Sequence, residues 1–159
     1  MYLLKHEAIH LSISLLIGYF VWKKYHKPIP AFAAAILGGF FIDIDHLFDY
    51  FLVFGLNFNL DYFLNSYQFI SSRKVYVPFH AWEWVILLTY LFWKLETNFK
   101  NKKNKISKYF LSILLALTLG VYSHLIIDTV TNEVVPLGYS IIYRAINGFN
   151  SNKISAAGI

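Results

Sequence analysis

Apolar residues fall into long runs along the chain, and each run ends at charged residues or prolines. Four such runs can form helices, at residues 8–22, 31–42, 80–94 and 109–130. A bilayer-spanning helix needs roughly 20 apolar residues, so the last run is long enough and the third becomes so when its ends are extended. We therefore predict an all-α membrane protein, a bundle of about four transmembrane helices.

The segments between the runs predict turns and short interfacial pieces. Pro28 and Pro30 separate the first two runs, because proline ends a helix. Residues 51–78 mix Asn, Ser and Asp with aromatic residues, and we expect them to lie along the membrane interface or over the site. Residues 136–149 are aromatic and amphiphilic with one charge, Arg144, which predicts another interfacial segment.

Small residues stand out in the second run, which reads AFAAAILGGF at residues 31–40. Alanine and glycine let two helix backbones approach closely inside a membrane. We therefore expect neighbouring helices to approach this run closely. No small-residue cleavage site follows the first run, so we expect that run to remain as a helix rather than to be removed as a signal peptide.

Composition supports the membrane assignment. Of the 159 residues, 57% are hydrophobic and only 14% are charged, which is too apolar for an ordinary soluble domain of this length. No linker, repeat or low-complexity tract divides the chain, so we expect one membrane-embedded domain over residues 1–159. Cysteine is absent, which excludes disulfides, thiol nucleophiles and thiolate metal ligands.

The distribution of basic residues along the chain is explained better by membrane orientation than by nucleic-acid binding. The net charge is +5, but six of the fourteen basic residues lie at 94–108, between two apolar runs. With four spans, this loop and the one after the first run share a side, which the positive-inside rule makes cytoplasmic. Both termini and residues 51–78 then face outward, in a multi-pass protein of the cell membrane.

The same orientation brings the chain's acidic and histidine residues to one depth, at the outer ends of the four helices. An ionisable group in a membrane segment costs about 3 kcal/mol or more, so several together indicate a shared function, and a bound cation is the simplest one. The residues concerned are His6, His10, Asp43, Asp45, His46, Asp49, His80, Glu83, His124 and Asp128.

Helical spacing joins several of these residues. Residues three or four apart share a face of a helix, which pairs Asp43 with His46 and Asp45 with Asp49. For this cluster, the alternative to a metal site is an acidic helix end at the membrane surface.

The remaining pairs also have less specific explanations. His6 and His10, four apart, are also consistent with two surface histidines, whereas His124 and Asp128, four apart within an apolar run, favour a ligand pair over a structural ion pair. His80 and Glu83 fit a ligand pair or a polar helix start equally well.

Histidine and aspartate without cysteine indicate zinc, with manganese or iron as alternatives, whereas calcium prefers oxygen ligands. Such an ion can lower the pKa of bound water from 15.7 to about 7 and polarise a phosphoryl or carbonyl oxygen. No phosphate-binding glycine loop and no G-x-S-x-G nucleophile motif is present. The chemistry expected is therefore metal-dependent hydrolysis.

Motifs along nearly the whole chain carry a family resemblance. They are His6 with His10, DIDH at 43–46, FHAWEW at 79–84, SHLIIDTVTN at 123–132 and PLGYSIIYRAINGF at 136–149. In their order and spacing the chain resembles the YdjM-like family of membrane-bound metal-dependent hydrolases. That family is distantly similar to zinc phospholipase C and the zinc-dependent single-strand nucleases. The resemblance implies one to three metal ions, held by His124 with Asp128, by Asp43 or Asp45 with His46, by His80 and, as a further candidate, by His10.

We therefore expect a hydrolase that acts on phosphoester bonds of lipids or lipid-like substrates. Glu7, Asp49 and Glu83 lie beside the expected ligands; we expect Glu83 to be the general base, with Asp49 the next candidate. One alternative is a transporter of divalent cations or protons, although the cytoplasmic halves of the four runs carry almost no polar groups. Another is a membrane module in which the metal only holds the helices together.

Overall fold

The computed structural model describes residues 2–99, 105–132 and 134–154. These residues form α-helices and short 3₁₀-helices, and none of them belongs to a β-strand, which confirms the all-α prediction. Lys100, Lys102 and Lys103, part of the predicted cytoplasmic charge, lie outside the described residues. The chain divides into two compact units, Met1–Ile42 with Glu83–Ile126 and Asp43–Trp82 with Ile127–Ile159.

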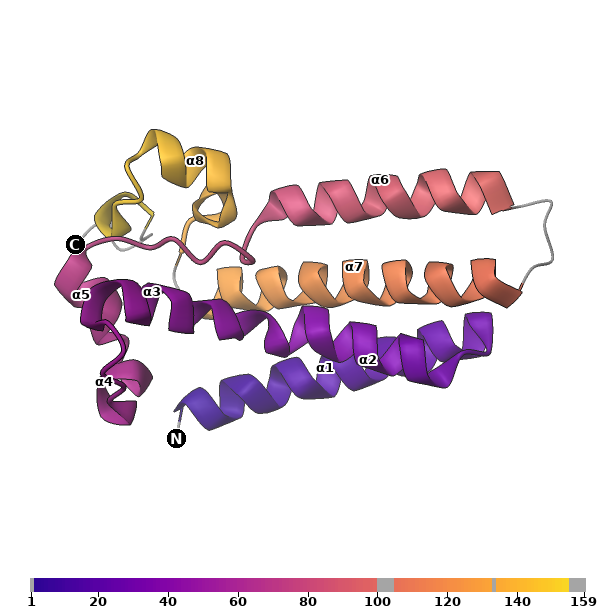
Figure 1. The fold of residues 1–159 in the computed structure, drawn as a ribbon, viewed down its shortest axis with the longest axis horizontal. Coiled ribbons are helices and arrows are strands. Elements are labelled where there is room, and N and C mark those ends of the chain that lie inside the picture. The colour runs from indigo at the N-terminus through magenta and orange to yellow at the C-terminus, as the bar shows by residue number, and fades with distance from the viewer. Residues whose placement is uncertain (1, 100–104, 133, 155–159) are drawn as a thin grey trace. The chain divides into compact units, whose positions relative to one another are not determined.

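The first unit is a bundle of four long helices (Figure 1). It contains α1 (Tyr2–Tyr25), α2 (Pro28–Gly39), α6 (Trp82–Phe99) and most of α7 (Lys105–Thr131). Figure 1 shows α6 running beside α7 in the opposite direction, and α2 returning along α1. The buried core of this unit joins three of the helices, and its residues are Val21, Tyr25, Ala31, Ala34, Ala35, Leu111 and Ala116. From α6, Phe92 and Leu95 pack against it.

Helices α2 and α7 approach most closely at glycines. A Cβ atom added to Gly120 would lie 2.9 Å from the carbonyl oxygen of Ala35 and 3.0 Å from the backbone nitrogen of Gly39. One added to Gly38 would lie 2.7 Å from the carbonyl oxygen of Leu117. Backbone atoms cannot move aside cheaply, so these positions require glycine. The predicted close contact of the small-residue helix is confirmed.

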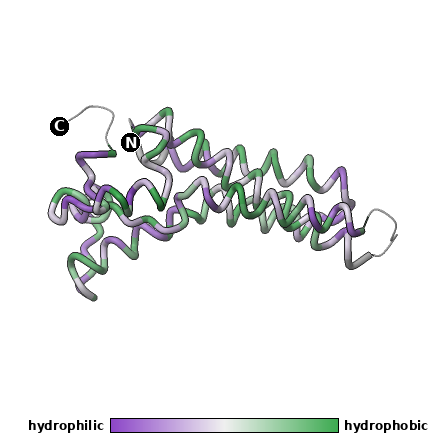
Figure 2. Tube along the Cα trace, turned by 90° about the horizontal axis from the view of Figure 1, so that it is seen from above, coloured by the Kyte–Doolittle hydropathy of each residue, from purple (hydrophilic) through white to green (hydrophobic). Residues whose placement is uncertain are grey.

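One described helix, over Ser107–Thr131, is long and apolar enough to cross a membrane. Helix α2 and the segment Phe41–Phe54 together pass the same test, but the chain bends by 50° between them. Figure 2 shows hydrophobic residues predominating along the long helices, with hydrophilic residues towards the ends where α1 and α6 finish. A membrane location is thus supported for one helix, and four spans and their orientation stay predictions.

The second unit consists of short helices joined by loops. Its helices are η1 (Phe41–Asp45, which begins in the first unit), α3 (His46–Phe54), α4 (Leu60–Leu64), α5 (Tyr67–Ser72), η2 (Pro136–Tyr139), α8 (Ile141–Ile146) and η3 (Ser151–Lys153). The segment 51–78, whose fold was not readable from sequence, thus forms the end of α3, the helices α4 and α5 and an extended loop. The polar Asn59 ends one loop here, because its side chain accepts hydrogen bonds from the backbone of Asp61 and Tyr62 at the start of α4.

The extended loop 73–81 is held in place by the end of the chain. The backbone N–H of Val75 donates to the carbonyl of Phe149 at 2.9 Å, and that of Ser151 donates to the carbonyl of Arg73 at 3.0 Å. Just beyond the loop, the indole N–H of Trp82 donates to the carbonyl of Pro136 at 2.8 Å. These bonds fix the backbone on both sides of His80.

Candidate metal centre

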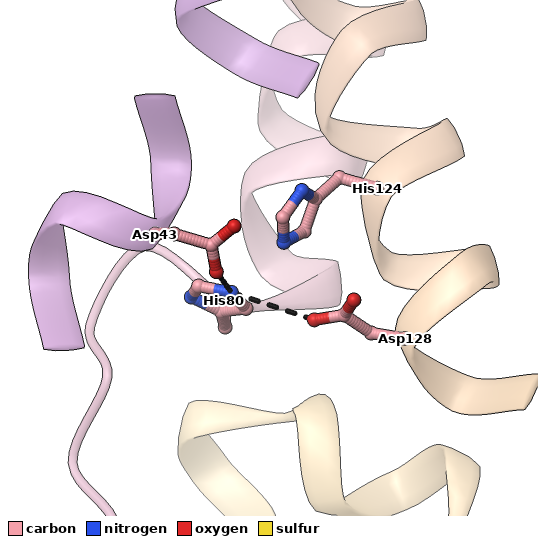
Figure 3. Close-up of side chains that lie close together, drawn as sticks. All are labelled: Asp43, His80, His124 and Asp128. Atoms are coloured by element: carbon pink, nitrogen blue, oxygen red, sulfur yellow. Dashed lines mark hydrogen bonds and ion pairs between the residues drawn. The ribbon is translucent and has the colours of Figure 1, made fainter. Parts of the chain in front are cut away.

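His80 lies at the centre of a group of carboxylates in the second unit. It comes from loop 73–81 and is only 1% exposed. Its Nε2 atom lies 3.1 Å from an oxygen of Asp43, which belongs to η1, and 3.5 Å from an oxygen of Asp128, near the end of α7. Figure 3 shows these three side chains converging from three separate elements of the fold.

The separations between these atoms match those of ligands around one metal ion. In a tetrahedral site with bonds of about 2.0 Å, neighbouring ligand atoms lie about 3.3 Å apart. The two distances from His80 Nε2, 3.1 Å and 3.5 Å, bracket that value. Each of Asp43, His80 and Asp128 offers one ligand atom, and these atoms all lie within 4.8 Å of one another. This group can hold a metal ion.

The other ring nitrogen of His80 is fixed by Asp45. Nδ1 forms a hydrogen bond of 3.1 Å with the Asp45 oxygen that also accepts the backbone N–H of Phe79 at 2.7 Å, and it lies 3.0 Å from the other Asp45 oxygen. When the ring is neutral and Nδ1–H donates to Asp45, Nε2, the atom that faces Asp43 and Asp128, offers its lone pair to an ion. A carboxylate on the second nitrogen of a histidine is the usual partner of a metal-binding imidazole.

His46 lies at the edge of the same group. Its Nε2 atom is 3.4 Å from an oxygen of Asp43, and its side chain is 31% exposed. The predicted spacing of Asp43 and His46 therefore does bring the two side chains together, at the junction of η1 and α3. With Asp45 and His80, His46 also forms a second group whose ligand atoms lie within 4.8 Å of one another.

His124 and His10, also predicted as ligands, lie in the first unit. His124 is fully buried on α7, one turn before Asp128, and is labelled in Figure 3. Its Nδ1 is 3.1 Å from the carbonyl oxygen of Gly39. Because a carbonyl only accepts hydrogen bonds, Nδ1 carries the proton and Nε2 has the lone pair. His10 is 1% exposed and stacks on His124, with ring centroids 4.0 Å apart.

Charged side chains also hold the loop that carries His80. Both oxygens of Asp49 accept the backbone N–H of Tyr76 at 3.2 Å, and one accepts that of Val77 at 2.9 Å. From α8, the guanidinium of Arg144 donates to the carbonyls of Val77 at 3.2 Å and of His80 at 2.9 Å. Asp49 and Arg144 are both buried, so these bonds act in surroundings where an unmade bond is costly.

The residue between these two charges has an unusual backbone conformation. Val77 has a φ of 27°, a region that β-branched residues avoid. Its N–H is bound by Asp49 and its carbonyl by Arg144. Strain of this kind persists only where the surroundings over-determine it, and it gathers at functional sites. The loop conformation is thus imposed by Asp49 and Arg144.

Tyr139 completes the surroundings of His80 in the second unit. It is buried, and its ring centroid lies 6.3 Å from that of His80. Burial first, and then the negative charge of Asp128, raise the pKa of the Tyr139 phenol far above its usual value. The phenol therefore keeps its proton at neutral pH and can act only as a neutral hydrogen-bonding group.

The two predicted general bases occupy different places. Asp49 lies in the first turn of α3 and uses both oxygens on loop backbone N–H groups. Glu83 is half-buried in the first turn of α6, in the first unit.

Sequence reasoning did not identify Val77 or Tyr139 as part of the surroundings of His80, and it predicted only that Arg144 lies in an interfacial segment. The available signal was a single arginine in an otherwise uncharged aromatic segment.

Comparisons of the chain with protein-family models, with curated proteins and with solved structures found no match. The resemblance to the YdjM-like hydrolases therefore rests on the sequence motifs alone and stays a prediction.

Proposed function

We propose that this chain is a membrane-bound, metal-dependent hydrolase in which Asp43, His80 and Asp128 bind a divalent ion. The observation that supports this most is the position of the His80 ring, whose Nδ1 is bound by Asp45 while Nε2 faces two carboxylates. The donor set of nitrogen and oxygen without sulfur fits zinc best, with manganese or iron as alternatives.

His124 stays a predicted ligand from its sequence position, four residues before Asp128. Helix α7 continues without a break from Lys105 to Thr131, so His124 and Asp128, four residues apart, share a face one turn apart. The bond from Nδ1 of His124 to the Gly39 carbonyl leaves Nε2 as the coordinating atom. His46, whose Nε2 lies 3.4 Å from Asp43, has the more exposed side chain of these two residues.

When bound, the ion supplies a Lewis acid and a water of lowered pKa. The chain's own residues prepare the site. Asp45 orients His80, and we assign Asp49 to positioning, because its oxygens are used on Tyr76 and Val77. For the proton transfer we retain Glu83 as the first candidate, on its sequence position three residues after His80.

The surface of the second unit supports a lipid-like substrate. Helix α3 and the loop after it expose large apolar side chains, including Phe48 at 50%, Leu52 at 56% and Leu56 at 93%. Helices α4 and α5 add Leu60, Tyr62, Leu64, Tyr67 and Ile70 to the exposed set. A surface of this kind next to a polar site suits a molecule with an acyl chain and a polar head. We therefore propose a phosphoester lipid as the substrate class.

The test is hydrolysis by the protein purified in mild detergent, with zinc, manganese or iron supplied. The substrates are a chromogenic phosphodiester and a phosphatidyl lipid in mixed micelles. We expect turnover in the wild type that a chelator abolishes, and a loss of at least 100-fold in His80→Asn and in Asp128→Asn. Asp61→Asn, which removes an exposed carboxylate of the same unit, is the matched control and should keep full turnover.

The absence of hydrolysis with every metal tried would contradict the proposed activity. If the ion nevertheless binds, its role is to hold the protein's elements together, as in structural sites whose ligands leave no open position. Equal turnover in wild type and His80→Asn would show that the hydrolysis comes from elsewhere.

A further inference from the structure

Tyr139 places a phenol beside the candidate metal centre. Its side chain is only 6% exposed, and its ring centroid lies 6.3 Å from that of His80, with 30° between the two ring planes. Burial is the main cause that raises the pKa of this phenol, and the charges of Asp128 and Asp43 raise it further, as expected for a hydroxyl near both carboxylates. Tyr139 thus belongs to the same part of the second unit as the proposed ligands.

The short helix η2, which carries Tyr139, is held in place by its neighbours. The carbonyl of Pro136 accepts the indole N–H of Trp82 at 2.8 Å, which ties η2 to the chain just beyond the extended loop. A Cβ atom added to Gly138 would lie 3.1 Å from the Cβ atom of Ile154, so the backbone packs closely here. The position of the phenol is therefore set by the fold.

The hydroxyl of Tyr139 accepts a hydrogen bond, and among the described residues it donates none. Nδ2 of Asn132 donates to it at 3.4 Å, and the backbone N–H of Asn132 in turn donates to the carbonyl of Asp128 at 2.9 Å. No described residue accepts the proton of the Tyr139 hydroxyl. A buried polar group whose bonds the protein does not complete usually meets a water, an ion or a ligand.

The hydroxyl lies where a ligand can reach it. The side chain of Asn132 is exposed, whereas the ring of Tyr139 is buried, so the hydroxyl is the end of Tyr139 that is nearer to the surface. Ionised carboxylates such as Asp43 and Asp128 only accept hydrogen bonds, so they offer no donor to an anionic substrate. A phenol O–H beside them supplies such a donor, and its bond to a charged oxygen is stronger than a bond between neutral groups.

We propose that Tyr139 donates a hydrogen bond from its hydroxyl to a phosphoryl oxygen of the substrate, which makes it a further catalytic residue. This inference rests on the proposed function. The proton stays on Tyr139, so its role differs from the proton transfer assigned to Glu83. The bond stabilises the negative charge that develops on the phosphoryl oxygen in the transition state.

The test compares the wild type with Tyr139→Phe, which removes only the hydroxyl. Both proteins are loaded with zinc in mild detergent and freed of excess zinc. We expect kcat for the chromogenic phosphodiester to fall about 100-fold, as when one donor to a developing oxyanion is removed, while the zinc content stays the same. In calorimetry, the affinity for inorganic phosphate should fall about 10-fold.

The matched control is Tyr143→Phe. The hydroxyl of Tyr143, in the same unit, donates to the carbonyl of Lys153 at 3.4 Å. Its loss should leave turnover, zinc content and phosphate affinity unchanged. Circular dichroism verifies that the helices of both variants remain.

The outcomes separate the role of Tyr139 from the hydrolase activity. If Tyr139→Phe hydrolyses the diester and binds phosphate like the wild type, or if the wild type binds no phosphate, Tyr139 does not donate to a phosphoryl oxygen. A loss of zinc from Tyr139→Phe would make it a positioning residue for the metal ligands and would also contradict the inference. If the wild type hydrolyses nothing while Tyr139→Phe still weakens phosphate binding, the hydrogen bond stands and the hydrolase activity falls.

Discussion

At the residue scale, the site depends on charged side chains that hydrogen-bond to the backbone of the loop, as well as on the side chains that face the metal position. The φ of 27° at Val77 costs about 1–3 kcal/mol in strain. The hydrogen bond that Asp49 accepts from the N–H of Val77 and the one that Arg144 donates to the carbonyl of Val77 contribute about 1.5–3 kcal/mol each and offset that cost. The result is a His80 backbone with little freedom, which lowers the entropy lost when the ring binds an ion.

This account gives Arg144 a positioning role that can be tested. Arg144→Gln removes the guanidinium from the carbonyls of Val77 and His80, so we expect the affinity for zinc to fall about 10- to 100-fold, as for other groups that orient ligands. Arg144→Lys, which keeps a charged donor, should recover part of that affinity. A chelator-competition assay measures the affinity, and circular dichroism shows whether the helices remain.

The matched control is Arg73→Gln, because Arg73 is an exposed arginine of the same unit. If Arg144→Gln binds zinc as tightly as the wild type, Arg144 does not position His80. A purely structural role would lower stability equally in the Gln and Lys variants and would leave the Lys variant without recovered affinity.

Sequence reasoning could find the side chains facing the site but not the ones supporting it. The closeness of Asp43 and His46 could be predicted from their spacing, because residues three apart on a helical stretch lie on the same face. The bonds from Arg144 to loop 73–81 join parts of the chain more than 60 residues apart, at backbone carbonyls that every residue has. Nothing in the local sequence distinguishes the carbonyls of Val77 and His80 from others.

At the element scale, the helix that leads into the site ends earlier than the sequence predicted. The apolar run at 31–42 predicted a continuous helix, but α2 ends at Gly39 and η1 follows from Phe41 to Asp45. Two consecutive glycines, Gly38 and Gly39, weaken the helix at this point. The 3₁₀ turn places residues three apart above one another, which brings Asp43 over His46.

The close contact of α2 with α7 predicts a stability effect at Gly120. Its Cβ position lies about 3 Å from backbone atoms of α2, so Gly120→Ala forces the helices apart and should cost about 1–3 kcal/mol, as overpacking usually does. We expect a lower melting temperature in detergent. Leu119→Ala, at the exposed neighbouring position, should melt close to the wild type. A Gly120→Ala melting temperature at or above that of the wild type would mean that α2 and α7 do not pack as described.

At the scale of the whole molecule, the lengths of the apolar runs predicted the all-α class, and the hydropathy of the individual helices limits how many membrane spans the structure supports. Among the described residues, one helix, over Ser107–Thr131, is long and apolar enough to cross a bilayer by itself. Helix α1 is long, but its first half carries Lys5, His6, Glu7 and His10, which the sequence analysis placed at the outer end of a span. Four spans thus remain a prediction from charge and run length, whereas the grouping of Asp43, His80 and Asp128 rests on distances of 3.1 Å and 3.5 Å within one unit.

The central claim is that Asp43, His80 and Asp128 bind a metal ion, and X-ray absorption at the zinc edge of the zinc-loaded protein tests it most directly. We predict nitrogen and oxygen neighbours at about 2.0–2.1 Å with the outer-shell scattering of imidazole and no sulfur. His80→Asn should remove the bound zinc. A wild-type protein that binds no zinc, or a spectrum and zinc content left unchanged by His80→Asn, would contradict the account.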